Sequence, residues 1–237
     1  MIEIRSGVEL PSVREEITLL TEDGLTLVGE LATPISGHVA ATLVTLHPLP
    51  TAGGFMDSHI LRKAANRLPA LANLAVLRFN TRGTESPRGK SQGAFGEGVT
   101  ERHDVAAAVA FAESRGLPNL WLVGWSFGTE LALKYGADKN VRGVILLSPP
   151  LHRTSEQELA VWANNGKRVI ALVPEFDDYL VPEQAEKRFK AIPQVELIAV
   201  DGAKHLWVGE AATKRVLDEI VRAVNPNSYP LPDTFEG

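Results

Sequence analysis

The stretch that decides the fold reads LWLVGWSFG and covers residues 120–128. Its first half is a short apolar run, which is typical of a strand buried on both faces of a sheet. The run enters a Gly-x-Ser-x-Gly turn, and residues 129–135 after it favour a helix. This context is typical of a nucleophile elbow, in which a strained turn raises the Ser126 hydroxyl above the sheet. We expect glycine at positions 124 and 128 because a Cβ there would clash with the neighbouring strand and helix.

Predicted strands and helices alternate on both sides of this motif. Near the start of the chain, two alternating runs flank Asp23-Gly24 and predict a hairpin of residues 17–20 with 26–31. Further strands are expected at 40–46, 75–79, 120–124, 144–147, 169–173 and 195–200, and helices at 56–71, 97–114, from about 126, 155–164, 183–191 and 210–224. This order predicts an α/β fold with a mostly parallel sheet of about eight strands and helices on both faces. We expect one domain over residues 1–237, with a core at about 17–224, a long loop at 80–96 and an irregular, proline-containing tail at 225–237.

The composition excludes several classes of function. The 237 residues carry a net charge of −5 at pH 7, and no basic patch of the kind that binds nucleic acid is evident. The chain has no cysteine, which excludes disulfides, a thiolate nucleophile and thiolate metal sites. No apolar run approaches the roughly 20 residues that span a bilayer, and the first residues lack the pattern of a secretory signal. We therefore expect a cytoplasmic protein without a membrane partner.

A serine nucleophile needs a general base, and the base needs a carboxylate to orient it. In a fold with this elbow, the acid and then the histidine follow the serine, each after a later strand. His205 fits because it follows the expected strand 195–200 in a glycine-containing turn. His47 precedes Ser126 on a different loop, and His152 is a candidate for the pocket wall. The remaining histidines are expected at the surface: His38, His59 and His103.

Two adjacent aspartates follow the expected strand 169–173, and only one of them can point at the imidazole. Asp178 is preferred as the acid, because it lies four residues before Pro182, where a helix is expected to start. Asp177 is the second candidate and Glu175 the third. Turn and N-cap chemistry before the helix accounts for the carboxylate that the imidazole does not use.

Acyl transfer also needs two backbone N–H donors for the oxyanion. One is expected from Phe127, the residue after the nucleophile. The second is expected from the loop after strand 40–46, where prolines at 48 and 50 cannot donate. Leu49 is therefore the favoured donor, and Thr51 is the alternative. Five side chains are candidates for the pocket wall, although packing explains each of them equally well: Trp125, Phe55, His152, Tyr179 and Trp207.

Taken together, these motifs resemble the compact bacterial α/β-hydrolases, which are described as dienelactone-hydrolase-like or serine aminopeptidase-like proteins. The resemblance rests on five segments, namely 47–54 (HPLPTAGG), 77–83 (LRFNTRG), 124–128 (GWSFG), 178–182 (DYLVP) and 202–205 (GAKH). It implies the α/β-hydrolase fold with Ser126 as nucleophile, Asp178 as acid and His205 as base. Dienelactone hydrolases proper use a cysteine, which this chain lacks. Only about twenty residues separate Ser148 from the strand at 169, so we expect at most a minimal cap.

The resemblance implies a serine hydrolase that cleaves a small or medium carboxylic ester or thioester through an acyl-enzyme. Its partner would be a small acyl substrate, and no metal or organic cofactor is expected. A non-catalytic binding protein on the same fold is the main alternative, because a fold does not by itself define a function. A peptidase ranks lower, because no segment for substrate gating is evident. The oligomeric state stays open.

Overall fold

The computed structural model describes residues 1–163 and 165–236. Its central sheet contains eight strands, namely β2 (Val13–Leu20), β3 (Thr26–Thr33), β4 (Ala41–Leu46), β5 (Leu74–Phe79), β8 (Leu120–Trp125), β9 (Val141–Leu147), β10 (Arg168–Phe176) and β11 (Glu196–Lys204). They follow the order β11-β10-β9-β8-β4-β5-β3-β2. The pairs from β11 to β5 are parallel, whereas β3 runs antiparallel to β5 and β2. This confirms the predicted eight-stranded, mostly parallel sheet.

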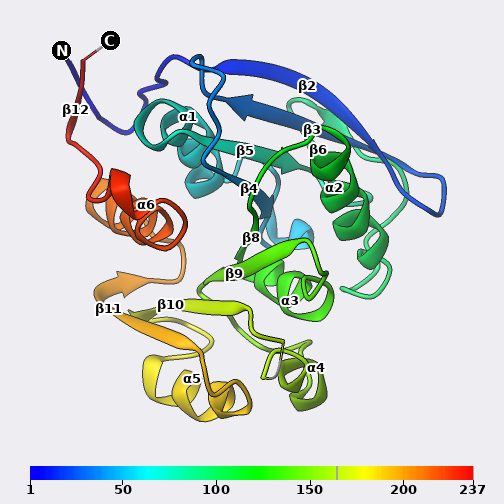
Figure 1. Ribbon diagram of the computed structural model, residues 1–237. Coiled ribbons are helices and arrows are strands. Elements are labelled where there is room, and N and C mark those ends of the chain that lie inside the picture. Colours follow the sequence, from blue (N-terminus) through cyan, green and yellow to red (C-terminus); the bar gives the residue numbers. More distant parts are fainter. Residues whose placement is uncertain (164, 237) are drawn as a thin grey trace.

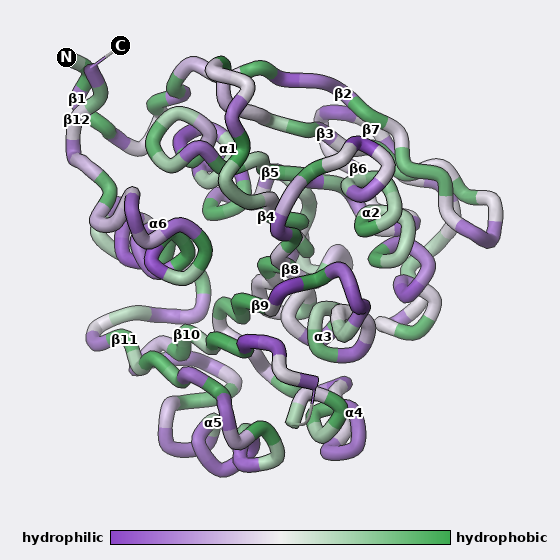
Figure 2. The backbone as a smooth tube through the Cα atoms, viewed as in Figure 1, coloured by the Kyte–Doolittle hydropathy of each residue, from purple (hydrophilic) through white to green (hydrophobic). Residues whose placement is uncertain are grey.

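Helices cover both faces of this sheet (Figure 1). They are α1 (His59–Ala72), α2 (Arg102–Ser114), α3 (Phe127–Tyr135), α4 (Glu156–Ala160), α5 (Pro182–Arg188) and α6 (Glu210–Val224). The apolar residues of α1 and α6 pack against one face, and those of α2, α3, α4 and α5 pack against the other. Figure 2 shows how hydrophobic the central strands β8, β9 and β10 are, as burial on both faces requires. None of the described helices combines the length and apolar content that a membrane crossing requires.

The helices expected at 97–114 and 155–164 are each shorter in the structure by five residues. The helix expected at 97–114 begins at Arg102, because Glu97 and Gly98 have positive φ angles that a helix excludes. The Glu101 carboxylate accepts hydrogen bonds from the Gly96 and Gly98 amides at 2.7 and 2.9 Å, and so holds that segment as a loop. The helix expected at 155–164 ends at Ala160 as α4, and position 164 lies outside the described residues. This one short helix is the only helix between β9 and β10 in the described chain, as the expected minimal cap requires.

The terminal tail is more ordered than expected. A short turn, η3 (Pro226–Ser228), follows α6, and β12 (Thr234–Phe235) pairs antiparallel with β1 (Ile2–Glu3). The two chain ends therefore lie side by side (Figure 1). Leu231 is buried beside α6 and anchors the segment between them. The expectation of an irregular tail was wrong for these residues, because two-residue pairing leaves no periodic pattern in the sequence.

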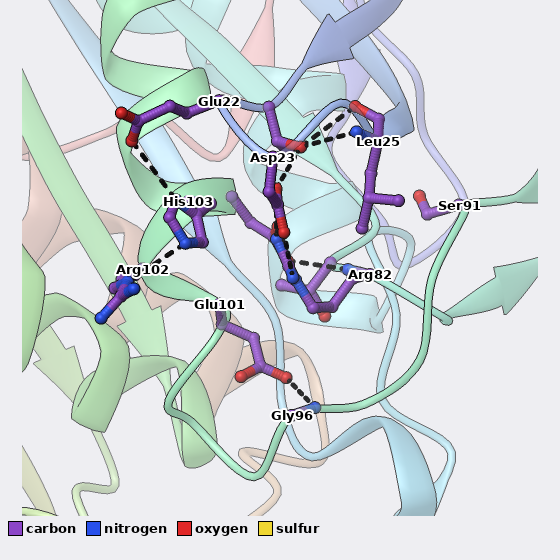
Figure 3. A network of polar contacts seen from close by, with 12 residues as sticks. Glu22, Asp23, Leu25, Arg82, Ser91, Gly96, Glu101, Arg102 and His103 are labelled. Atoms are coloured by element: carbon purple, nitrogen blue, oxygen red, sulfur yellow. Dashed lines mark hydrogen bonds and ion pairs between the residues drawn. The ribbon is translucent and has the colours of Figure 1, made fainter.

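Arg82 holds the long loop after β5 in place (Figure 3). Its guanidinium donates to Asp104 on α2 at 2.8 and 3.0 Å and to Asp23 in the β2–β3 turn at 2.8 and 3.1 Å. The Arg82 amide donates to Asp104 as well, at 2.8 Å. This network ties three segments together, so the polar loop that contains the hairpin of β6 (Glu85–Ser86) and β7 (Gly89–Lys90) is fixed against the sheet.

Candidate active site

The candidate site lies at the carboxyl edge of the parallel strands, where ligands bind in open α/β sheets. Strand β4 leads into the segment with Leu49, and β8 leads into Ser126. Strands β10 and β11 are in register such that Phe176 pairs with Lys204. The residues that follow this pair, Asp177 and His205, therefore start side by side. The sheet register thus brings together residues that are far apart in the chain.

The elbow places Ser126 in a backbone conformation that side chains rarely adopt, with φ 52° and ψ −118°. The Ser126 amide donates to the Leu147 carbonyl on β9 at 2.9 Å, which fixes the turn to the sheet. A Cβ on Gly128 would lie 2.0 Å from the Leu46 carbonyl oxygen, and one on Gly124 would lie 2.3 Å from the Gly128 oxygen. Both contacts are with backbone, so neither could relax cheaply. The close approach explains why only glycine fits on either side of the serine.

Three side chains form a continuous hydrogen-bond chain at this edge. Ser126 Oγ donates to His205 Nε2 at 2.9 Å, and His205 Nδ1 donates to Asp177 Oδ2 at 2.9 Å. The other Asp177 oxygen accepts from the amides of Tyr179 and Leu180 at 2.8 and 3.2 Å. Burial acts to raise the pKa of Asp177, but the hydrogen bonds from His205 and these amides outweigh it and hold that pKa below its ordinary value. Asp177 is therefore held ionised, as the orienting partner of an imidazole must be.

The preference for Asp178 as the partner of His205 was wrong. Strand β10 continues to Phe176, three residues beyond the expected end, so Asp177 is the first residue past the strand and turns inward. Asp178 is exposed. Glu175 is not the partner of the imidazole either, because its carboxylate instead accepts a hydrogen bond from the Gly202 amide at 2.7 Å. The feature that identifies Asp177 is its Asx turn, in which the carboxylate accepts hydrogen bonds from the backbone amides two and three residues later in the chain.

The backbone of the histidine loop is held from three directions. Trp125 Nε1 and Ser148 Oγ both donate to the His205 carbonyl, at 3.1 and 3.0 Å. His59 Nε2 donates to the Leu206 carbonyl at 2.7 Å. His59 was expected at the surface, but it is half-buried and its ring packs edge-on against Trp125. These side chains fix where the imidazole sits relative to the serine.

The two expected oxyanion donors face the same cavity. Leu49 and Phe127 both line it beside Ser126. Within the described residues, neither amide donates to a protein acceptor. Thr51, the alternative donor, lies instead in the turn η1 (Pro50–Ala52) and faces a neighbouring groove. Two residues of the cavity wall thus have amides without a protein acceptor in the described chain, which is compatible with the donors that a tetrahedral oxyanion requires.

His47 fixes the segment that carries Leu49. It is fully buried, and its Nε2 accepts the Thr81 amide at 3.1 Å, so the ring proton must be on Nδ1. Nδ1 donates to the Pro48 carbonyl at 2.6 Å. Burial lowers the pKa of His47 to about 4, against an ordinary value of 6.5, and the Pro48 carbonyl only partly opposes this. A neutral imidazole thus connects Thr81, which follows β5, with the segment that carries Leu49.

This buried histidine predicts a specific loss of stability in acid. Because its pKa is lower in the folded than in the unfolded chain, the unfolded chain binds the extra proton first. Stability falls from pH 6.5 towards pH 4, by about 3 kcal/mol in total from this group. We expect urea unfolding of His47→Gln, which keeps a donor and an acceptor, to show a smaller loss than the wild type across this range. Equal losses in the two proteins would contradict the assignment of a neutral, buried His47.

The cavity above Ser126 has a volume of about 160 Å³. Of the expected wall residues, Trp125, His152 and Tyr179 line it. Tyr179 packs edge-on against His205, with 4.6 Å between the ring centres, and His152 packs edge-on against Tyr179, with 5.5 Å between the ring centres. The two other candidates were wrong for this cavity. Phe55 lines the neighbouring groove, and Trp207 is fully buried in the core beside α6.

Sequence reasoning missed two charged residues of the cavity wall, Glu130 and Arg153. Glu130 lies one helical turn after Ser126, so the i, i+4 spacing on α3 would have placed it on the same face. Arg153 follows His152 in the loop after β9, and no local pattern distinguishes it. In the part of the chain that the structure describes, no cluster of three or more histidines, aspartates or glutamates could hold a metal ion.

Comparison with known proteins places the fold. No family model and no curated protein sequence matches the chain. Among solved structures, a serine hydrolase homologue from Coxiella burnetii superposes with a TM-score of 0.75 at 25% identity, covering 89% of this chain and 97% of that one. A serine hydrolase without a lid from Xanthomonas campestris gives 0.72 at 24% identity, covering 96% and 99%. An esterase from Pyrococcus furiosus gives 0.71 at 19% identity, covering 90% and 93%. The chain therefore has the compact α/β-hydrolase fold, as its motifs predicted.

Proposed function

We propose that the protein is a serine hydrolase that cleaves small or medium carboxylic esters or thioesters. The observation that carries this proposal is the hydrogen-bond chain from Ser126 through His205 to Asp177, in a cavity whose wall includes two residues with amides that donate to no acceptor in the described chain. A serine on a strained turn, with an oriented base and oxyanion donors, is the arrangement that acyl transfer requires. The similarity to serine hydrolases and an esterase supports the same chemistry.

The reaction follows from these positions. Ser126 Oγ attacks the carbonyl carbon while its proton moves to His205 Nε2, and Asp177 stays ionised and stabilises the imidazolium. The amides of Leu49 and Phe127 hold the oxyanion. The tetrahedral intermediate collapses to an acyl-enzyme as His205 passes its proton to the departing alcohol or thiol. Water then attacks the acyl-enzyme, giving its proton to His205, and the carboxylic acid leaves as Ser126 regains its proton.

A fluorophosphonate probe tests this proposal directly, because it phosphonylates only an activated serine. We expect one probe per chain, mapped to the peptide that contains Ser126, and no labelling of heat-unfolded protein. A panel of p-nitrophenyl esters and acyl thioesters of increasing chain length then measures the substrate range. The absence of labelling in folded protein would favour a non-catalytic binding protein on the same fold.

A further inference from the structure

A buried carboxylate in the cavity wall takes no part in the proposed reaction. Glu130 on α3 is fully buried, and an unpaired carboxylate would be costly there. Among the described residues, both partners of its carboxylate lie on Arg153. The Arg153 amide donates to one oxygen, and Arg153 Nη1 lies 3.5 Å from the other. Glu130 therefore anchors both the backbone and the side chain of Arg153.

The Arg153 guanidinium is also held by an aromatic ring. Its Cζ lies 5.6 Å from the centre of the Phe127 ring, within the range of a cation–π contact. Phe127 and Arg153 line the same cavity as Ser126, so the ring holds the guanidinium in the wall of the site. The ion pair and the ring together restrict a side chain that is otherwise among the most flexible.

The anchored guanidinium keeps donors free. Arginine has five N–H donors, and within the described chain the Arg153 side chain meets no acceptor other than Glu130. Its side chain is 34% exposed, whereas that of Glu130 is 1% exposed. Arg153 lines the same cavity as Ser126 and His205. Both residues belong to the cavity wall, but the Arg153 side chain is far more exposed to a bound molecule than the Glu130 carboxylate behind it.

We propose that Arg153 binds an anionic group of the substrate, such as a carboxylate, so that the site prefers esters that carry a negative charge. A guanidinium fork matches a carboxylate through two parallel hydrogen bonds, which a neutral ester cannot form. The preference is one of binding, and it acts mainly on KM. This inference rests on the proposed ester hydrolysis at Ser126.

Matched pairs of substrates test it. p-Nitrophenyl hemiglutarate against p-nitrophenyl butyrate places the charge on the acyl side, and 4-acetoxybenzoate against phenyl acetate places it on the leaving group. We expect kcat/KM to favour the charged member of at least one pair by about 10-fold or more. No preference in either pair would overturn the inference. If no ester of any kind is hydrolysed, the proposed function fails and this inference fails with it.

Variants assign the preference to Arg153. Glu130→Gln/Arg153→Gln removes both charges together and so avoids an unpaired buried carboxylate. We expect its ratio of kcat/KM for charged over neutral ester to fall to about 1, mainly through KM, whereas a purely structural role would lower kcat for both esters alike. Arg153→Lys keeps the charge without the fork, and we expect an intermediate ratio.

Lys134→Gln is the matched control. Lys134 Nζ contacts the Arg153 carbonyl at 3.3 Å but does not line the cavity. Its loss removes a nearby positive charge but no group that lines the cavity, so we expect the wild-type ratio. A fall in the ratio as large as that of the double variant would assign the preference to the general electrostatic field of the nearby positive charges, and it would overturn a specific role for Arg153.

Discussion

Ser126→Ala is expected to lower kcat/KM for short-chain p-nitrophenyl esters by about 10⁴-fold or more. The variant loses the only oxygen that can form the acyl-enzyme, while the oxyanion donors and the cavity remain. Its fold should be unchanged, because within the described chain the serine side chain makes no hydrogen bond except that to His205. The strained backbone at this position suits alanine no worse than serine. Steady-state kinetics and a thermal unfolding curve measure the two quantities separately.

The matched control for this variant is Ser114→Ala. Ser114 is exposed at the end of α2, where the Phe111 carbonyl is the one hydrogen-bond partner of its hydroxyl among the residues that the structure describes. We expect this variant to keep wild-type kcat/KM, which would show that a serine-to-alanine change elsewhere in the chain does not by itself lower the activity. Activity of Ser126→Ala within about 10-fold of the wild type would exclude Ser126 as the nucleophile.

The sequence predicted those features that depend on residues close together in the chain. The elbow is an example, because a buried strand, a Gly-x-Ser-x-Gly turn and a helix are all local patterns within 120–135. Leu49 was singled out from equally local information, because the prolines on either side of it cannot donate, and the structure places it in the cavity wall. His205 was found from its place after a late strand, and the contact with Ser126 agrees with that order.

The predictions that were wrong or missing concern features that depend on register and packing between segments far apart in the chain. Asp177 and Asp178 differ by one position, and β10 decides between them by continuing to Phe176 in pairing with β11. Trp207 lies two residues after His205, yet it has a positive φ of 51° and its ring packs into the core. Arg153 gains its place from a carboxylate 23 positions earlier in the chain. No periodic pattern carries any of these contacts.

Asp177→Asn and Asp178→Asn should separate these two neighbouring residues sharply. An asparagine at 177 keeps an oxygen for the Tyr179 amide, so the turn before α5 is preserved. Facing His205 Nδ1, however, the uncharged amide neither stabilises an imidazolium nor fixes the tautomer in which Nε2 accepts the Ser126 proton. We expect kcat for ester hydrolysis to fall by about 10⁴-fold. Asp178→Asn alters an exposed side chain and should change kcat by less than about 3-fold.

The comparison is informative because the two variants make the same chemical change at adjacent positions. Both remove one negative charge from the same turn, so a general electrostatic effect on the site would lower both rates alike. Only the direct contact between Asp177 Oδ2 and His205 Nδ1, at 2.9 Å, separates them. Similar losses in both variants would assign the effect to the general electrostatic field of the turn, and a larger loss in Asp178→Asn would mean that His205 takes a different partner in the working enzyme. Probe labelling of Ser126 in Asp177→Asn should slow together with ester hydrolysis, because the same proton transfer activates the serine in both reactions.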